Sequence, residues 1–152
     1  MNQHTSLAAV LLAFTFSAMA QERKIDQSAL PPAVQKTISQ QSKGATIKGY
    51  STEREHGKQV YEAEMIINGH SKDIQIASDG ALNEVEEEVA FATLPQKVQS
   101  ALKAKAAGAK ITKVESLTKH DKLVAYEAVI LNGSKRGEIQ VGPSGETLAH
   151  EE

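Results

Sequence analysis

An internal repeat, with an offset of 64 or 65 residues, is the feature of the sequence that most constrains the fold. Leu94-Pro95 lies 64 positions after Leu30-Pro31, and six matches of this kind occur in the same order in both halves of the chain. The matches are Leu30-Pro31 with Leu94-Pro95, Val34-Gln35 with Val98-Gln99, Gly44-Ala45 with Gly108-Ala109, Tyr61-Glu62-Ala63 with Tyr126-Glu127-Ala128, Asn68-Gly69 with Asn132-Gly133, and Ile74-Gln75-Ile76 with Ile139-Gln140-Val141. A fixed period of this length indicates a tandem duplication. We predict a first repeat with its linker over 29–92 and a second over 93–152, with a short bridge at 89–92.

The first 20 residues have the features of a secretory signal peptide. An apolar stretch from Leu7 to Phe16 is followed by Ala18-Met19-Ala20, a small-x-small cleavage site, although no Lys or Arg precedes it. The stretch is too short to span a bilayer and is followed at once by charged residues. We predict cleavage before Gln21, an N-terminal extension over 21–28, and a soluble protein that is periplasmic or secreted.

The composition excludes several classes of partner and of chemistry. The chain has 17 basic and 19 acidic residues, no Trp and 4% aromatic residues. It therefore lacks the basic surface and the stacking side chains that nucleic-acid binding uses, and it predicts no stable membrane insertion. The sequence has no Cys, so disulfides and thiol catalysis are excluded.

Each predicted repeat begins with a helix of about three turns. Pro is tolerated in the first turn, and Gly44 and Gly108 stand where a left-handed residue commonly ends a helix. The predicted buried faces comprise Ala33, Val34, Thr37 and Ile38 in the first repeat, and Val98, Ala101, Leu102 and Ala106 in the second.

Short alternating segments after each helix predict antiparallel strands. They cover 47–53, 59–67, 72–77 and 82–86 in the first repeat, and 111–117, 123–131, 138–141 and 146–149 in the second. Asn68-Gly69 between two of them is a strong hairpin signal. The predicted fold class is α+β: two tandem units, each one helix packed on a four-strand antiparallel meander. Whether the two sheets join into one stays open.

Alternation along these strands separates a core face from an opposite face. Tyr61, Ala63 and Met65 should cover the first helix, whereas Glu62 and Glu64 should lie on the other side of the sheet. That side is predicted to be less polar in the second repeat, where Ala125 and Val129 occur. The candidate partner-binding residues on this opposite face are Glu62, Glu64, Gln75, Glu127 and Gln140, although an ordinary solvated sheet face is the favoured interpretation of these five.

The order of these motifs resembles the PepSY-like family of exported bacterial proteins. The shared pattern is Leu-Pro opening a short helix, a glycine, then Tyr-Glu-Ala, Asn-Gly, Ile-Gln-Ile and an Asp-Gly turn, and it covers most of the chain after the signal peptide, twice. The resemblance implies the fold type of the beta-lactamase inhibitor protein, a location in the cell envelope and a role in inhibiting or regulating peptidases. The inhibitor protein has disulfides and this chain has none, so its target is not carried over.

The sequence contains no motif for a nucleophile, a phosphate loop, a dinucleotide site or a zinc protease. We therefore predict a protein that is not an enzyme, with no catalytic residues and no cofactor. His56 and His120 lie 64 positions apart in predicted turns, and could be metal ligands or a pH switch, but solvated hairpin tips are the favoured interpretation.

Two acidic clusters have a similar pair of interpretations. They comprise Glu84, Glu86, Glu87 and Glu88 in the first repeat, and Glu146, Glu151 and Glu152 in the second. Together with Asp79 they could hold calcium, but their spacing does not match a calcium loop, and a solvated strand end is favoured, with no metal site. The sequence thus predicts an exported protein that binds a protein partner in the envelope, as an inhibitor or regulator of a hydrolase. The alternative is a periplasmic binder of a small ligand or metal ion.

Overall fold

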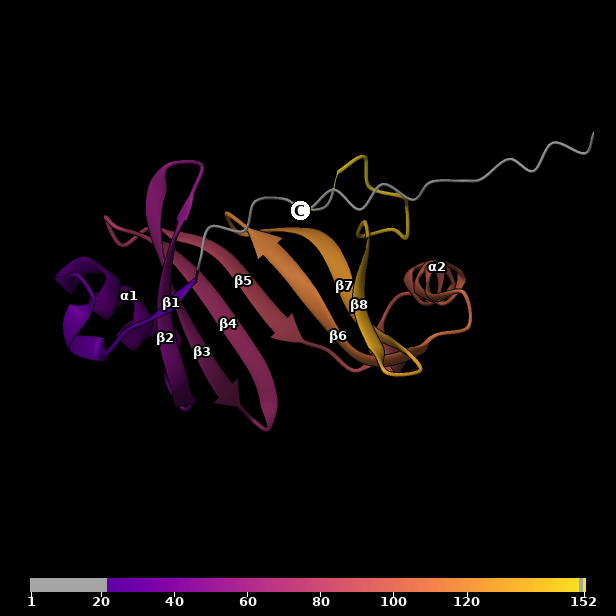
Figure 1. The fold of residues 1–152 in the computed structure, drawn as a ribbon, viewed down its shortest axis with the longest axis horizontal. Helices are drawn as coiled ribbons and strands as arrows, with labels where there is room; N and C mark the ends of the chain where they lie inside the picture. The colour runs from indigo at the N-terminus through magenta and orange to yellow at the C-terminus, as the bar shows by residue number, and fades with distance from the viewer. Residues whose placement is uncertain (1–21, 151) are drawn as a thin grey trace, which may run out of the picture.

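A computed structural model describes residues 22–150 and 152, so the predicted signal peptide and its cleavage site lie outside the described residues. The described chain forms one antiparallel sheet with a helix at each end, as Figure 1 shows. The strands are β1 (Arg23–Lys24), β2 (Thr46–Glu55), β3 (Lys58–Ile67), β4 (His70–Ala77), β5 (Leu82–Glu88), β6 (Lys110–Lys119), β7 (Lys122–Asn132) and β8 (Lys135–Val141). The helices are α1 (Pro32–Gln41) and α2 (Gln96–Ala106), each preceded by a short 3-10 helix, η1 (Gln27–Ala29) or η2 (Phe91–Thr93).

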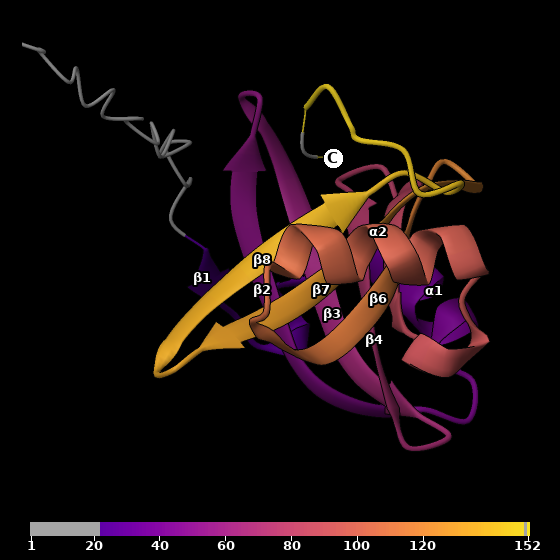
Figure 2. The same cartoon turned by 90° about the vertical axis from the view of Figure 1, so that its right-hand side faces the viewer.

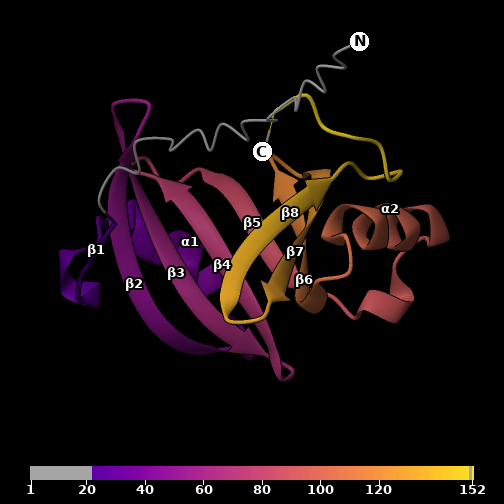
Figure 3. The same cartoon turned by 45° about the vertical axis from the view of Figure 1, so that its right-hand side comes forward.

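The predicted fold class is wrong, because the eight strands form a single sheet in chain order and the molecule is mostly β. β5 pairs with β6 over the bridge between the predicted repeats, with Glu86 opposite Leu117 and Glu88 opposite Glu115. Two separate meanders would each expose an unpaired edge at this point, and the pairing satisfies both edges. Figure 3 shows β2 to β5 on the left and β6 to β8 with α2 on the right, and the strand order joins the two groups into one sheet.

The predicted second repeat has three strands, β6 to β8, whereas the predicted first repeat has four, β2 to β5, which corrects the prediction of a strand over 146–149. After β8 the chain makes a turn in which the Gly142 N–H donates to the Glu146 carbonyl at 2.8 Å. The Glu146 carboxylate accepts from the Ser144 N–H at 2.9 Å and from the Ser144 hydroxyl at 2.7 Å. These local bonds end the sheet at Val141.

Both helices pack on the same face of the sheet. Against α1 lie Ala63, Met65, Ile74 and Ile76, and against α2 lie Val114, Ala128 and Val141. The register connects the two sets by a row of paired residues that starts at Met65 and ends at Val141. The row runs through Met65, Lys72, Glu87, Ser116, Tyr126 and Val141. Figure 2 shows α2 lying across β6 to β8. The other face of the sheet carries no helix of the described chain.

The two helices begin in the same way, which explains where each one starts. The Gln35 amide donates to the Leu30 carbonyl at 2.8 Å, and the Gln99 amide donates to the Leu94 carbonyl at 2.9 Å. Each bond ties the helix to the chain before it, and Leu30 and Leu94 are themselves buried. The two halves thus share local structure at matching positions, and the duplication itself stays a prediction. None of the helices in the described part of the chain is long and apolar enough to cross a membrane.

Candidate functional site: an acidic face of the sheet

The face of the sheet away from the helices gathers carboxylates from five consecutive strands. Strand register places them in rows: Glu62 is beside Gln75 and Gln75 beside Glu84, while Glu64 is beside Asp73 and Asp73 beside Glu86. A third row joins Glu115 to Glu127 and Glu127 to Gln140. We name as the acidic face the following side chains: Glu62, Glu64, Asp73, Glu84, Glu86, Glu115 and Glu127.

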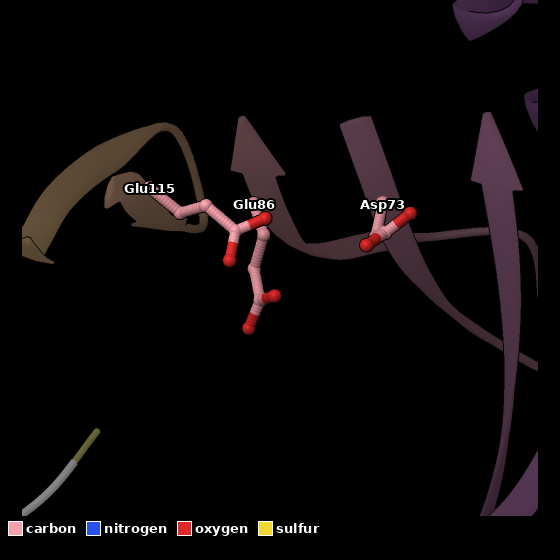
Figure 4. Close-up of side chains that lie close together, drawn as sticks. All are labelled: Asp73, Glu86 and Glu115. Atoms are coloured by element: carbon pink, nitrogen blue, oxygen red, sulfur yellow. The ribbon is translucent and has the colours of Figure 1, made fainter. Parts of the chain in front are cut away.

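Three of these carboxylates, from β4, β5 and β6, converge near the middle of the sheet. Oxygen atoms of Asp73, Glu86 and Glu115 all lie within 4.8 Å of one another. In Figure 4 the Glu115 side chain extends toward Glu86, with Asp73 on the neighbouring strand. The pairing of β5 with β6 brings them together, because it places the Glu115 strand beside the Glu86 strand. Oxygen donors in this arrangement suit a hard cation or an organic cation.

Burial and mutual repulsion make ionisation of several of these groups costly. Burial, followed by the nearby charge of Glu84, raises the pKa of Glu86 to about 8. Burial, followed by the charge of Asp73, raises the pKa of Glu62 to about 7, and burial with the charge of Glu115 raises the pKa of Asp73 to about 6. Near neutral pH the acidic face therefore holds protons that ordinary surface carboxylates have already released.

Two lysines supply part of the missing positive charge. Lys113 Nζ lies 2.7 Å from Glu115 Oε1, and Lys119 Nζ lies 3.6 Å from Glu84 Oε2 and 3.7 Å from Glu152 Oε2. Burial alone would lower the pKa of Lys113, but its hydrogen bond to Glu115 and the charge of that carboxylate raise it. Lys113 is thus fully charged, and it pairs with Glu115 as Lys119 pairs with Glu84.

The residues that the sequence predicted for partner binding all lie on the face opposite the helices. Glu62 and Gln75 line a hollow of about 170 Å³ together with Glu53, Asp73, Glu84 and Glu86. Glu64 is half-buried next to Asp73. Glu127 and Gln140 lie in the second half, where the Gln140 amide donates to Glu127 at 2.7 Å and its oxygen accepts from the Glu152 N–H at 2.8 Å. Gln140 is buried, whereas Glu62, Glu64, Gln75 and Glu127 are all partly exposed.

Buried apolar side chains adjoin the carboxylates on the same face. Leu117 lies opposite Glu86 and next to Ala125 in the register, and Val60 precedes Glu62 by two positions. Leu117, Ala125, Val129 and Val60 are all buried. Ala125 and Val129 lie on this face beside Glu127, as the alternation predicted. Because each of the four apolar side chains is at most 7% exposed, they pack within the protein and offer a partner little contact area.

The two histidines that the sequence singled out line one hollow at the end of the sheet. His56 and His120 both have left-handed backbones, with φ of 48° and 49°, at the tips of the hairpins β2–β3 and β6–β7. The hollow is about 310 Å³ and also includes Glu84 and Lys119. Among the described residues, neither histidine belongs to a group of three whose ligand atoms converge. Solvated hairpin tips remain the simpler interpretation, and His56 is highly exposed.

Sequence reasoning missed the convergence of Asp73, Glu86 and Glu115. It assigned Glu86 to a solvated strand end, whereas the structure turns this side chain into the acidic face and leaves the adjacent Glu87 exposed on the helix side. Strand alternation would have separated Glu86 from Glu87, but the position of Glu115 depends on the pairing of β5 with β6, which no local pattern encodes.

A carboxyl group that is protonated near neutral pH could in principle donate a proton to a substrate. The hydroxyls beside these carboxylates are already engaged: Ser51 donates to Glu62 at 3.3 Å, and Ser71 donates to Glu88 at 3.2 Å and to Glu115 at 3.4 Å. Within the part of the chain that is described, the face thus pairs hydroxyls with carboxylates and not with an imidazole base. The groups that the face offers to a ligand are carboxylate oxygens, which suit a cation.

Comparison with known proteins identifies the fold. No family model matches the sequence, and no match was found among curated proteins. Solved structures do match. A BLIP-like protein from Bacteroides fragilis NCTC 9343 is 20% identical, with a TM-score of 0.58 over 80% of this chain and 86% of that one. A DUF2874 family protein from Bacteroides ovatus ATCC 8483 is 18% identical, with a TM-score of 0.59 over 78% and 84% of the two chains.

A third match is a protein from Bacteroides eggerthii DSM 20697 whose name gives a periplasmic location provisionally. It is 16% identical, with a TM-score of 0.62 over 77% of this chain and 84% of that one. The chain therefore has a BLIP-like fold, as the resemblance implied. Identity at this level shows the fold alone, so membership of the PepSY-like family stays a prediction.

Proposed function

We propose that this chain is a non-enzymatic binding protein of the bacterial cell envelope, which recognises a positively charged partner through the acidic face. The observation that carries the proposal is the convergence of half-buried carboxylates, with raised pKa values at Glu62, Asp73 and Glu86, on the sheet face that neither α1 nor α2 covers. Like charges in such proximity destabilise the free protein, and a partner's cations would relieve that repulsion.

Lysine or arginine side chains are the partner groups that fit this face best. The cationic groups would enter between the rows of carboxylates, most of which are half-buried side chains on neighbouring strands. Complementary charge increases the rate and the specificity of association. The finer part of the proposal is that the partner is an exported hydrolase with a basic segment, whose activity the chain inhibits or regulates.

The location in the envelope is part of the same proposal. It is supported by the signal-like sequence of residues 1–20, which has a small-x-small site before Gln21. The provisional periplasmic name of the B. eggerthii protein is consistent with it. Cell fractionation, with the N-terminal residue of the purified protein determined by mass spectrometry, tests it. Recovery of an uncleaved chain from the cytoplasm would contradict the proposed location.

Capture from an envelope extract tests the function. The native protein is compared with the double variant Glu62→Gln, Glu86→Gln and with the control Glu87→Gln, which changes the adjacent, exposed side chain on the opposite face. The proposal predicts a basic partner that is retained by native protein and by the control, lost by the double variant, and weakened by added salt. Equal retention by all three proteins, or no partner at all, would contradict it.

A second candidate function is binding of a divalent cation at Asp73, Glu86 and Glu115, which the 4.8 Å spacing of their oxygen atoms favours. Thermal unfolding with and without calcium tests this candidate. A ligand present at 100 times its dissociation constant stabilises a fold by about 2.7 kcal/mol. A calcium-dependent increase in the melting temperature that Glu86→Gln abolishes and Glu87→Gln leaves intact would support the cation site. No shift with calcium would leave the protein partner as the sole proposal.

A further inference from the structure

A further hollow lies on the helix side of the sheet, where it is independent of the acidic face. It has a volume of about 510 Å³ and is formed where η2, the C-terminal end of α2 and the start of β6 meet. Its lining comprises Phe91, Lys103, Ala106, Gly108, Ala109 and Ile111. Sites for small ligands commonly have about 300–1,000 Å³ and a mostly apolar lining with few polar groups. This hollow has both properties.

Lys103 adds one positive charge to the mostly apolar lining of the hollow. The Lys103 ammonium lies 5.4 Å from the centroid of the Phe91 ring, a cation–π geometry, and both side chains line the hollow. It is the single charged side chain among the six lining residues. An apolar floor with one positive charge above it matches a molecule that has an apolar body and one negative group.

The corresponding positions of the first half do not form such a lining. With the offset of 64 residues that relates the two halves, Phe91 corresponds to Gln27, Lys103 to Ser39 and Ala106 to Ser42. The remaining three positions are the same in kind, because Gly108, Ala109 and Ile111 correspond to Gly44, Ala45 and Ile47. The first half therefore has the same local fold without Phe91, Lys103 or an alanine at the position of Ala106. These three residues distinguish the second half from the first, and they give the hollow its apolar surface and its charge.

We propose that this hollow binds a small amphiphile with a carboxylate, with its apolar body against Phe91, Ala106 and Ile111 and its carboxylate at Lys103. The charge is placed by the fold before the ligand arrives, which reduces the ordering cost of binding. The proposal predicts a preference for the anionic form, because a neutral molecule with the same apolar body would leave the Lys103 contact unused.

Titration of the purified protein with decanoate, followed by NMR, tests the proposal. Decan-1-ol and decyltrimethylammonium serve as neutral and cationic probes with the same apolar body. We expect saturable shifts of the backbone amide signals of Gly108, Ala109 and Ile111 with decanoate, weaker binding of decan-1-ol and the weakest binding of the cation. Shifts spread over the whole surface, or equal binding of the three probes, would overturn the proposal.

Two variants and one control distinguish the two parts of the site. Lys103→Gln should weaken decanoate binding about three-fold, as expected for an exposed ion pair, and leave decan-1-ol unchanged. Phe91→Gln, which introduces the residue type of position 27, should weaken both about ten-fold. Lys36→Gln on α1 is the control and should have no effect. If Phe91→Gln unfolds the protein, Lys103→Gln still tests the proposal, because Lys103 is exposed. Decanoate binding that is unchanged in Lys103→Gln would overturn the proposal.

Discussion

Lys113 Nζ lies 2.7 Å from Glu115 Oε1, and this ion pair supplies the nearest positive charge to the convergent carboxylates. The Glu115 side chain is only 5% exposed, whereas Lys113 is 33% exposed. Lys113→Met would leave a buried carboxylate without its ammonium partner, close to Asp73 and Glu86. Urea denaturation at pH 8 should show a free energy of unfolding lower by about 1–3 kcal/mol.

The combination of Lys113→Met with Glu115→Gln is the control for this prediction. The neutral amide removes the unpaired charge, so the double variant should recover most of the lost stability. Equal stability of native protein and Lys113→Met would show that water already screens this pair, and would contradict its place in the acidic face.

The raised pKa values predict an unusual dependence of stability on pH. A carboxyl group whose pKa is higher in the folded protein than in the unfolded chain stays protonated to a higher pH when folded. Its contribution to stability is therefore lost as the pH rises through the folded pKa. Unfolded Glu has a pKa of about 4.5, and the values for Asp73, Glu62 and Glu86 are about 6, 7 and 8. The free energy of unfolding should therefore fall between about pH 5 and pH 8, by on the order of 2 kcal/mol after screening.

Glu86→Gln and Glu87→Gln provide the matched comparison for this pH dependence. Glu86→Gln should be more stable than native protein at pH 8 and should flatten the pH profile, because it removes a buried charge and its repulsion. Glu87→Gln lies on the exposed opposite side and should keep the native profile. Urea denaturation series at four pH values measure both, and a native profile that rises from pH 5 to pH 8 would be inconsistent with the account.

Two glycines hold the two helices against the sheet by close contact with a helix carbonyl. A Cβ at Gly80 would lie 2.9 Å from the Ala33 carbonyl oxygen, and a Cβ at Gly145 would lie 2.7 Å from the Lys97 carbonyl oxygen. Both glycines also have positive φ, of 90° and 86°. Gly80→Ala and Gly145→Ala should each lower the free energy of unfolding by about 2–4 kcal/mol.

Gly69 separates the backbone cost in these variants from the steric cost. Its φ is 85°, but a Cβ there would meet nothing within 4 Å. Gly69→Ala should therefore cost only about 1–2 kcal/mol, the cost of a left-handed backbone. Thermal denaturation of the three variants measures the difference, and equal destabilisation in all three would mean that the close approach to the helices contributes nothing.

Local patterns predicted most of the strands and the two faces of the sheet. The alternation in β3 placed Tyr61, Ala63 and Met65 toward α1 and Glu62 and Glu64 away from it, and the structure agrees. Asn68-Gly69 forms the predicted turn, with φ of 51° and 85°. These features depend on neighbours within a few residues, which sequence patterns report directly.

Long-range pairing was not predictable in the same way. Nothing in the 82–88 or 110–119 segments specifies that Glu88 lies opposite Glu115, so the sequence left the joining of the two sheets open. The same pairing creates the Asp73, Glu86 and Glu115 set, which was therefore missed. The final predicted strand failed for a local reason, since the Glu146 carboxylate binds the Ser144 N–H and stabilises a turn.

Binding of a synthetic lysine-rich peptide to the purified protein tests the central claim most directly, by calorimetry at low and at physiological salt. Binding by the acidic face predicts saturable binding that weakens with salt, that the double variant Glu62→Gln, Glu86→Gln loses, and that Glu87→Gln keeps. Binding that is equal in native protein and the double variant, or no binding of the peptide at low salt, would contradict the claim that these carboxylates recognise a cationic partner.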